Sequence, residues 1–308
     1  MKRATVDEAG VTKRMVFDKP VSDLAPLTAA VRAKESERSD RIVNDPLARK
    51  LATELGMGLL KQFPQIFADI EAITTKVFDD WISQFVAEGG TQVVVIGAGV
   101  DARPYRLEIL RGGKVQWWEV DYESIISYKE KVLEGDMPLC SLARVAVDIR
   151  TKELPLILER EGLDLKKRIL WLAEGVFQYF SEGEVRNVLR TIRKISVDGS
   201  CVLFSALSNS TKSHTEQYQG TMVFLKDMGA PLTFKLDSPQ EFLETEGLVN
   251  NDVIFTGHTS AHYGRLPWPP ASEPPEGYPT HWYIKCYLGK QQLHDTQTAM
   301  RNRKPSQT

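Results

Sequence analysis

Glycines and acids at the ends of two apolar stretches are the residues in this chain best suited to chemistry. Val93–Ile96 is an unbroken apolar run, and Gly97-Ala98-Gly99 follows it directly. Glycines let the backbone turn sharply and leave room for a ligand against it. The next apolar stretch ends in Glu119 and Asp121, about twenty residues further on, where a Rossmann-type fold places the carboxylate that holds a ribose. The pattern therefore indicates a nucleotide-type cofactor.

The loop after the glycines bears on which cofactor that is. GAGVDA fits the dinucleotide fingerprint, with Ala102 in its last place. Pro104, however, suits the first turn of a helix, so we expect the helix to begin several residues past the glycines. Asp101 and Arg103 would then lie in the intervening loop. An acid beside a base suits the ammonium and carboxylate of S-adenosylmethionine better than a pyrophosphate.

Two further strand-like stretches end in residues that could reach the same ligand. Asp148 and Ile149 follow Leu142–Val147, and Glu174 follows Ile169–Ala173. In open α/β sheets, ligands bind outside the carboxyl ends of the strands. We therefore expect these three residues to lie near Asp121.

Several ordered motifs resemble the leucine carboxyl methyltransferase family, including its polyketide-tailoring O-methyltransferases. The matching segments are Ala33–Ser36, Asp45–Ala48, Ile96–Leu107, Trp118–Asp121, Ala173–Phe180 and Tyr263–Arg265. The resemblance covers about Leu27 to Leu288. It implies an S-adenosylmethionine-dependent O-methyltransferase of secondary metabolism, acting on a carboxylate or phenolic hydroxyl of a small, polyketide-like molecule.

Other functions fit parts of the same pattern. A protein C-terminal carboxylate is the near alternative as acceptor, and a module that binds the cofactor without catalysis is another possibility. An NAD(P)-dependent reductase is disfavoured, because Tyr122 and Tyr179 lack a lysine at Tyr-x-x-x-Lys spacing.

The resemblance also implies roles for individual residues. Gly97, Ala98, Gly99 and Glu119 would line the cofactor, Asp121 would hold the ribose hydroxyls, Asp148 and Ile149 would form the adenine pocket, and Glu174 would reach the amino-acid end or methyl region. Arg103, Arg32 and Lys76 are the candidate cations for the cofactor carboxylate. Family members commonly carry an arginine two positions before a basic residue on the long helix. Here Thr74 takes the first position, so Lys76 would act as a less directional charge.

His258 and His262 are the candidate catalytic bases. A carboxylic acid is already ionised at pH 7 and needs no base, whereas a phenol with a pKa near 10 benefits from one. Because neither histidine has an evident orienting partner, the sequence favours a carboxylate weakly. No histidine or cysteine cluster has metal-ligand surroundings, so we expect no metal.

Composition limits the partners and the location. The 308 residues carry a net charge of −2 with pI ≈ 6.3, so there is no general attraction to nucleic acid or to an anionic membrane. No apolar run approaches membrane-spanning length, and no apolar segment follows Met1-Lys2-Arg3 as in a signal peptide. Three cysteines without CxxC spacing fit a reducing compartment. We expect a soluble, cytoplasmic protein with a small-molecule acceptor.

The order of periodic segments predicts an α/β fold, a Rossmann-like doubly wound, mostly parallel sheet. Residues 1–90 would form a helical cap, 91–208 the cofactor-binding core, 209–250 a lid or substrate insertion, 251–289 the last strands and 290–308 a disordered tail. The resemblance implies seven strands, the last antiparallel. Ser181–Glu184 and Ser238–Glu241 both match the capping-box pattern and predict helix starts.

Overall fold

The computed structural model describes residues 5–6, 12–13, 17, 19–208, 216–274 and 280–289. The tail expected at 290–308 lies outside this part of the chain.

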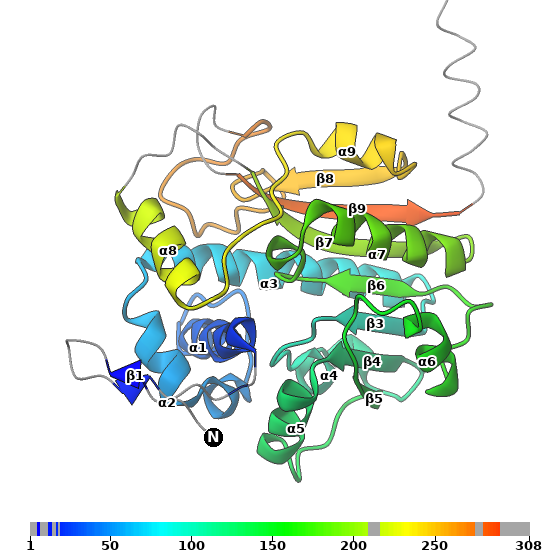
Figure 1. Ribbon diagram of the computed structural model, residues 1–308, viewed down its shortest axis with the longest axis horizontal. Helices are drawn as coiled ribbons and strands as arrows, with labels where there is room; N and C mark the ends of the chain where they lie inside the picture. Colours follow the sequence, from blue (N-terminus) through cyan, green and yellow to red (C-terminus); the bar gives the residue numbers. More distant parts are fainter. Residues whose placement is uncertain are drawn as a thin grey trace, which may run out of the picture.

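A seven-stranded sheet forms the centre of the molecule (Figure 1). Its strands are β3 (Gln92–Ile96), β4 (Gln116–Asp121), β5 (Ser141–Ala146), β6 (Leu170–Ala173), β7 (Ser200–Leu207), β8 (Asn251–Phe255) and β9 (His281–Leu288). Their spatial order is β5-β4-β3-β6-β7-β9-β8. Strands β3 to β7 pair in parallel, and β9 pairs antiparallel with both β7 and β8. The predicted fold class is confirmed. A separate antiparallel pair joins β1 (Thr5–Val6) to β2 (Thr12–Lys13).

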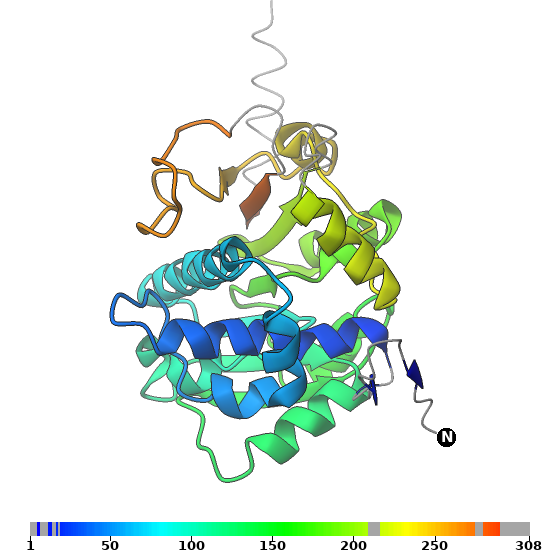
Figure 2. The same cartoon turned by 90° about the vertical axis from the view of Figure 1, so that its left-hand side faces the viewer.

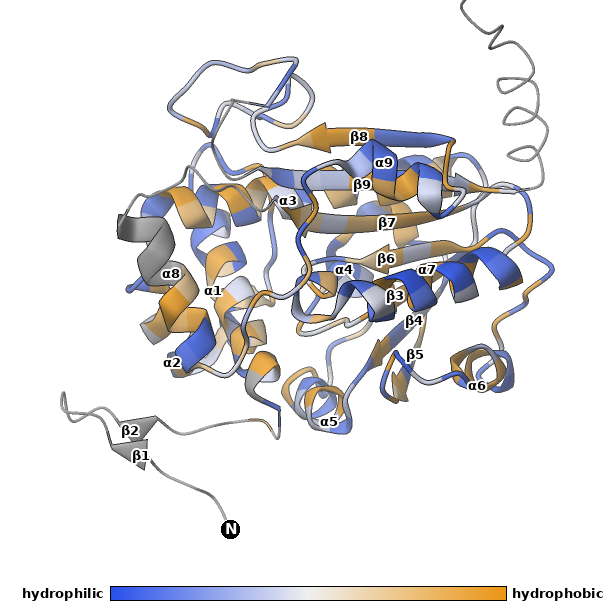
Figure 3. Cartoon of the chain, turned by 45° about the horizontal axis from the view of Figure 1, so that its top comes forward, coloured by the Kyte–Doolittle hydropathy of each residue, from blue (hydrophilic) through white to orange (hydrophobic). Residues whose placement is uncertain are grey.

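The central strands are apolar because helices cover both faces of the sheet. Every residue of β3 and β6 is buried, and Figure 3 shows β6 and β7 coloured as hydrophobic. Successive side chains of a strand point to opposite faces. Val93 and Val95 accordingly join one hydrophobic cluster, while Val94 and Ile96 join the other.

Helix α3 (Gln65–Ala87) covers one face of the sheet. Ile73, Val77 and Phe78 pack in the same cluster as Val93 and Val95 of β3. Helix α3 lies within the segment predicted as the N-terminal cap, and it is therefore also a layer of the central α/β structure.

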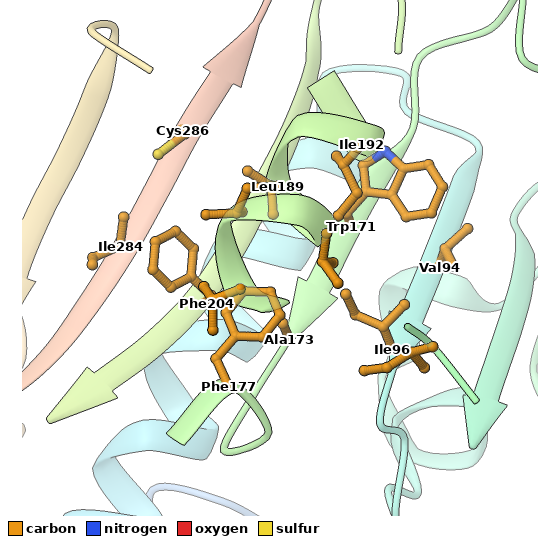
Figure 4. Packing of buried hydrophobic residues seen from close by; sticks show 14 of the residues in the cluster. Val94, Ile96, Trp171, Ala173, Phe177, Leu189, Ile192, Phe204, Ile284 and Cys286 are labelled. Carbon is orange, nitrogen blue, oxygen red and sulfur yellow. The ribbon is translucent and has the colours of Figure 1, made fainter. Parts of the chain in front are cut away.

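The opposite face carries α6 (Leu154–Arg160), α7 (Glu182–Ile195) and α9 (Pro239–Thr245). Figure 4 shows Leu189 and Ile192 of α7 lying over Trp171 and Phe204. Ser181 caps α7 as predicted, since its Oγ accepts from the Glu184 N–H and its own N–H donates to Glu184 Oε2.

The capping box predicted at Ser238–Glu241 does not form, although a helix does begin there. Ser238 stands at the N-cap of α9 without a capping hydrogen bond from its side chain. Its ψ is 82°, whereas Ser181 has the extended value of 154°. A cap needs extended backbone to aim the side-chain oxygen at the first-turn N–H groups.

Helical segments from the N-terminal region lie together with α8 (Glu216–Asp227) at one end of the molecule, on the left in Figure 1 and facing the viewer in Figure 2. They are η1 (Pro20–Leu24), α1 (Ala25–Ser36) and α2 (Ala48–Leu60). Leu225 and Met228 of α8 pack with Leu24 of η1. The segment predicted as a lid or substrate insertion therefore packs against the N-terminal helical region. Among the residues that the structure describes, no helix combines the length and apolarity needed to cross a membrane.

The remaining short helices connect the strands. They are α4 (Arg103–Arg106), η2 (Glu108–Leu110), α5 (Glu123–Val132) and η3 (Phe177–Tyr179).

Candidate cofactor and acceptor site

A cavity of about 920 Å³ lies at the carboxyl ends of the parallel strands, beside α1, α3 and α8. This volume is near the top of the ~300–1,000 Å³ usual for ligand pockets. The chain runs outward from β3 through β4 to β5, then returns to place β6 on the other side of β3. Such a reversal of strand order is where doubly wound folds bind ligands.

The glycine turn forms the floor of one end of the cavity. Gly97 and Gly99 have φ of +71° and +49°, a region that glycine enters without strain. The N–H groups of Gly97 and Ala98 both donate to the carbonyl oxygen of Val120. A Cβ on Gly97 would lie 2.5 Å from Val176 Cγ2, so this position accepts no side chain. Helix α4 begins at Arg103, past the glycines, as Pro104 predicted; Arg103 is its first residue, not part of the loop.

Asp121 ties the ends of β3 and β4 together at the cavity wall. Its Oδ2 accepts from the Gly99 N–H at 2.7 Å, and its Oδ1 accepts from the Tyr122 N–H at 2.7 Å. Burial raises the pKa of the Asp121 carboxyl, and these two hydrogen bonds act against that rise. A carboxylate has about four acceptor positions, so the group can still receive two hydroxyls from a ligand.

Arg103 gathers the acids at the same end. Its guanidinium is buried and lies 2.6 Å from Asp79 Oδ1, 2.7 Å from Asp101 Oδ2 and 2.7 Å from Glu174 Oε2. Burial opposes ionisation of Asp101, yet Arg103 and three more distant cations hold the pKa of its carboxyl well below the usual range. Arg103 therefore holds three acids together at this end of the cavity, and these acids neutralise its charge.

Arg32 connects α1 to the glycine turn. Its Nε lies 2.8 Å from Asp45 Oδ2, and its Nη2 donates to the Val100 carbonyl oxygen at 2.7 Å. The side chain lines the cavity. This second cation is thus paired as well.

The motifs just described belong to a known family. The family model for leucine carboxyl methyltransferase matches residues 25–193. That range is more than half of the chain, and it holds the glycine turn, Asp121 and Glu174. The chain belongs to the leucine carboxyl methyltransferase family.

Curated relatives agree with this membership. Proteins from Mycobacterium tuberculosis and Mycobacterium bovis are 29% identical over 208 residues, which cover 62% of this chain and 66% of each relative. They carry the provisional name of S-adenosyl-L-methionine-dependent methyltransferases. The match thus spans slightly less than two thirds of the relatives' length. The S-adenosylmethionine prediction is confirmed at the level of the family.

Solved structures show the same fold at low identity. A DUF574 family protein from Streptomyces avermitilis has a TM-score of 0.56 at 14% identity and covers 85% of this chain and 97% of its own. A structure from Thermobifida fusca, titled provisionally as a methyltransferase, has a TM-score of 0.56 at 16% identity, with coverages of 86% and 94%. At these identities the likeness concerns the fold alone.

Most of the predicted cofactor residues of this family member line the one cavity. Those that do so are Arg32, Gly97, Ala98, Gly99, Arg103, Asp121, Ile149 and Glu174. Glu119, Lys76 and Asp148 do not line it.

Glu119 lies below the cavity inside the sheet. Its side chain is fully buried, 2.7 Å from Lys129 Nζ and 2.9 Å from Arg144 Nε. Two residues along a strand span about 7 Å, so Glu119 stays below the strand end that Asp121 reaches. The acid neutralises the buried Lys129 and the partly buried Arg144, and it does not line the cavity.

Lys76 and Asp148 are held by neighbours outside the cavity lining. Lys76 pairs with Asp80 one turn along α3 and lies 5.5 Å from the ring centre of Tyr263. Asp148 binds the Arg150 guanidinium at 2.6 and 2.9 Å and accepts from the Arg150 N–H at 3.0 Å. The hydrogen bond to Arg150 lowers the pKa of Asp148. Asp148 thus closes a local turn with Arg150 and lies outside the cavity lining.

His258 and His262 do not line the cavity either, which corrects their assignment as catalytic bases. His258 Nδ1 lies 2.7 Å from Ser260 Oγ. His262 Nε2 lies 2.6 Å from the Trp268 carbonyl oxygen, and its Nδ1 accepts from the Gly264 N–H. Both ring nitrogens of His262 are therefore occupied within the loop.

Glu71 and His281 are cavity residues that the sequence analysis missed. Burial and the nearby Glu174 raise the pKa of Glu71 to about 7, while Arg32 acts to lower it. Burial lowers the pKa of His281 to about 4, so this imidazole is neutral at physiological pH. The sequence did contain a signal for Glu71. It stands four residues after Phe67 and three before Thr74, a spacing that places all three on one face of a helix.

Proposed function

We propose that this chain transfers a methyl group from S-adenosylmethionine to an oxygen atom of a small, largely apolar molecule. One observation carries the proposal: a single cavity joins the glycine turn and Asp121 to an apolar compartment. Family membership supports methyl transfer as the reaction. The side chains of the compartment are Phe63, Ile66, Phe67, Ile70, Met222, Leu225, Leu232 and Phe255.

The cavity residues fit the parts of the cofactor. Gly97 and Gly99 offer a turn without side chains, and Asp121 offers a carboxylate for the ribose hydroxyls. Ile149, with Ile125, supplies apolar surface beside Asp121 that suits a purine ring. Glu174 is partly exposed to the cavity and lies 2.7 Å from Arg103, so its carboxylate is placed to receive the ammonium of the cofactor.

The bound cofactor supplies a methyl group on a positively charged sulfur. The residues of this chain would hold the acceptor in line with that carbon, and their apolar side chains would exclude water. Orientation in a dry cavity provides most of what such a displacement requires.

Titration calorimetry and a transfer screen test the proposal. We expect S-adenosylmethionine and S-adenosylhomocysteine to bind and NAD not to bind. Tritiated methyl groups should then appear in a small-molecule fraction when the chain is offered a panel of phenols, alcohols and carboxylic acids. Binding of NAD in preference to S-adenosylmethionine would refute the cofactor. Cofactor binding with transfer only to a peptide carboxylate would refute the small-molecule acceptor.

A further inference from the structure

We propose, on the basis of the function proposed above, that the acceptor presents an uncharged hydroxyl and that Glu71 receives its proton. The alternative that this displaces is a carboxylate acceptor, which the sequence favoured weakly because it revealed no base with an orienting partner.

Glu71 lies between the two ends of the cavity. One face of α3 lines the cavity through Phe67, Ile70, Glu71, Thr74 and Thr75, as the helical repeat requires. The Thr75 carbonyl oxygen accepts from Arg103 Nη2 at 3.3 Å, which places that turn at the cofactor end.

The preceding turn of α3 faces the apolar compartment. The Phe67 ring is 4.4 Å from that of Phe63, which in turn contacts Phe224 of α8. Glu71 is one helical turn from Phe67 and less than one from Thr74. Its carboxyl therefore stands at the border where acceptor and methyl donor would meet.

The groups around Glu71 leave it able to exchange a proton near neutrality. Arg32 of α1 is a cation, Glu174 after β6 is an anion, and both act on the Glu71 carboxyl. Tyr179 of η3 and Tyr283 of β9 also sense its charge, and burial raises the pKa of each phenol. With burial and Glu174 raising the pKa of Glu71 to about 7, the carboxyl is matched to general-base work at physiological pH.

The charges along the cavity disfavour an anionic acceptor. Each of the three arginines that line it already has an acidic partner. The pairs are Arg32 with Asp45, Arg103 with Asp79, Asp101 and Glu174, and Arg106 with Asp79. Among the described residues, the remaining titratable side chains of the cavity include Glu71, Glu273 and a neutral His281.

Among the described residues, a second carboxylate beside Glu71 would therefore meet like charge and no arginine that lacks an acidic partner. The sulfonium of the donor would be its one nearby counter-charge, and S-adenosylhomocysteine lacks that charge. Like charges in a buried site cannot both ionise without a large cost. A hydroxyl avoids this cost and donates a hydrogen bond to the Glu71 carboxylate.

The reaction balances with these groups alone. The hydroxyl oxygen forms a bond to the methyl carbon as the carbon–sulfur bond breaks. Sulfur keeps the electron pair of that bond and becomes a neutral thioether. The hydroxyl proton passes to Glu71, so the products are a methyl ether, S-adenosylhomocysteine and a protonated Glu71.

Matched binding probes test the acceptor class without turnover. 2-Naphthol and 2-naphthoic acid share one ring system and differ in charge at pH 8. In calorimetry with saturating S-adenosylhomocysteine, we expect naphthol to bind at least about tenfold more tightly than naphthoate, which corresponds to ~1.4 kcal/mol. Glu71→Gln should tighten naphthoate binding by about tenfold. Asp69→Asn removes an acid of the same helix that does not line the cavity and should change neither affinity.

The outcomes separate this inference from the function on which it rests. Failure of S-adenosylhomocysteine to bind in these titrations would contradict the proposed function. Normal S-adenosylhomocysteine binding with naphthoate at least as tight as naphthol would overturn the hydroxyl acceptor alone, as would a Glu71→Gln variant that leaves the ratio unchanged.

Single-turnover rates test the role of Glu71 as base. With a phenol methylated in the screen, the wild-type rate should rise with pH through about 7 and then level. Glu71→Gln should slow this step about 10²–10⁴-fold while its affinity for S-adenosylmethionine stays unchanged. A variant that turns over normally but binds S-adenosylmethionine and S-adenosylhomocysteine weakly would show that Glu71 holds the cofactor ammonium, and the base assignment would then be wrong.

Discussion

At the scale of single residues, Glu119 and Asp121 show how two acids of one strand acquire different tasks. They lie on the same face of β4, two positions apart. Glu119 is enclosed with Lys129 and Arg144, whereas Asp121 binds backbone N–H groups at the cavity wall. We therefore expect Glu119 to stabilise the fold and Asp121 to bind the ligand.

Substitution of Asp121 should therefore affect ligand affinity, and substitution of Glu119 should affect stability. Asp121→Ala should weaken S-adenosylmethionine and S-adenosylhomocysteine alike, by about 1.5–3 kcal/mol, because both would lose hydrogen bonds to a charged acceptor. Glu119→Gln should instead lower the free energy of unfolding by about 3–5 kcal/mol, because the buried Lys129 and the partly buried Arg144 lose their counter-charge. Calorimetry and urea unfolding of both variants provide the measurements. Equal loss of ligand affinity in the two variants would contradict the assignment.

Glu71 should make the stability of the ligand-free chain depend on pH. Its folded pKa of about 7 exceeds the ordinary value of 4.5, so between these values the folded state binds more protons than the unfolded state. Stability from this group is complete below about pH 4.5 and is lost as the pH rises through 7. Glu71→Gln removes the free-energy cost of holding a charged carboxylate at this position in the folded chain. It should raise the free energy of unfolding by about 1–3 kcal/mol at pH 8 and change it little at pH 5.

Urea unfolding of Glu71→Gln and Asp69→Asn at pH 5 and 8 checks this dependence. A Glu71→Gln effect of the same size at both pH values would show that the carboxyl titrates in its ordinary range in the folded chain.

At the scale of elements, the two capping-box sequences form a natural comparison. Ser181 makes the reciprocal bonds with Glu184, and Ser238 makes no capping bond. Ser181→Ala should thus cost about 1 kcal/mol of unfolding free energy, while Ser238→Ala should cost only a few tenths. Urea midpoints of the two variants measure the difference, and an equal cost would mean that Ser238 caps α9 in solution.

Helix α3 shows why the boundary predicted near residue 90 does not separate two independent parts. Ile73 and Phe78 pack on the sheet, while Glu71, Thr74 and Thr75 line the cavity. A single helix thus belongs to the N-terminal region, to the central layers and to the candidate site.

At the scale of the whole molecule, this sharing predicts cooperative unfolding. Arg32 joins α1 to the glycine turn, and Arg265, near the end of the chain, pairs with Glu35 and Asp40. We expect one calorimetric unfolding transition that S-adenosylhomocysteine shifts upward as a unit. The stabilisation should be about 2.7 kcal/mol at a ligand concentration 100 times Kd. Two transitions, of which the ligand moves only one, would show that cap and core unfold separately.

The fold class, two helix starts and the glycine turn could be predicted from the sequence because local patterns indicate them. An unbroken, mostly β-branched run such as Val93–Ile96, bounded by glycines, favours a strand covered on both faces. Pro104 marks the helix start, and Ser181 with Glu184 marks another. Since parallel strands end at one edge, the same patterns also placed Asp121 and Glu174 in one cavity.

Only the tertiary structure decided which charged residues face that cavity. Glu119 and Lys76 fitted the expected motifs, but Lys129, Arg144 and Asp80 hold them elsewhere. Conversely, helical spacing alone does not distinguish Glu71 from a solvent-exposed helix acid. It lines the cavity because α3 packs against the sheet. The partners of a side chain come from segments distant in sequence, and its burial depends on the layers that enclose it. The direction and protonation of each acid therefore follow from packing, which no local pattern contains.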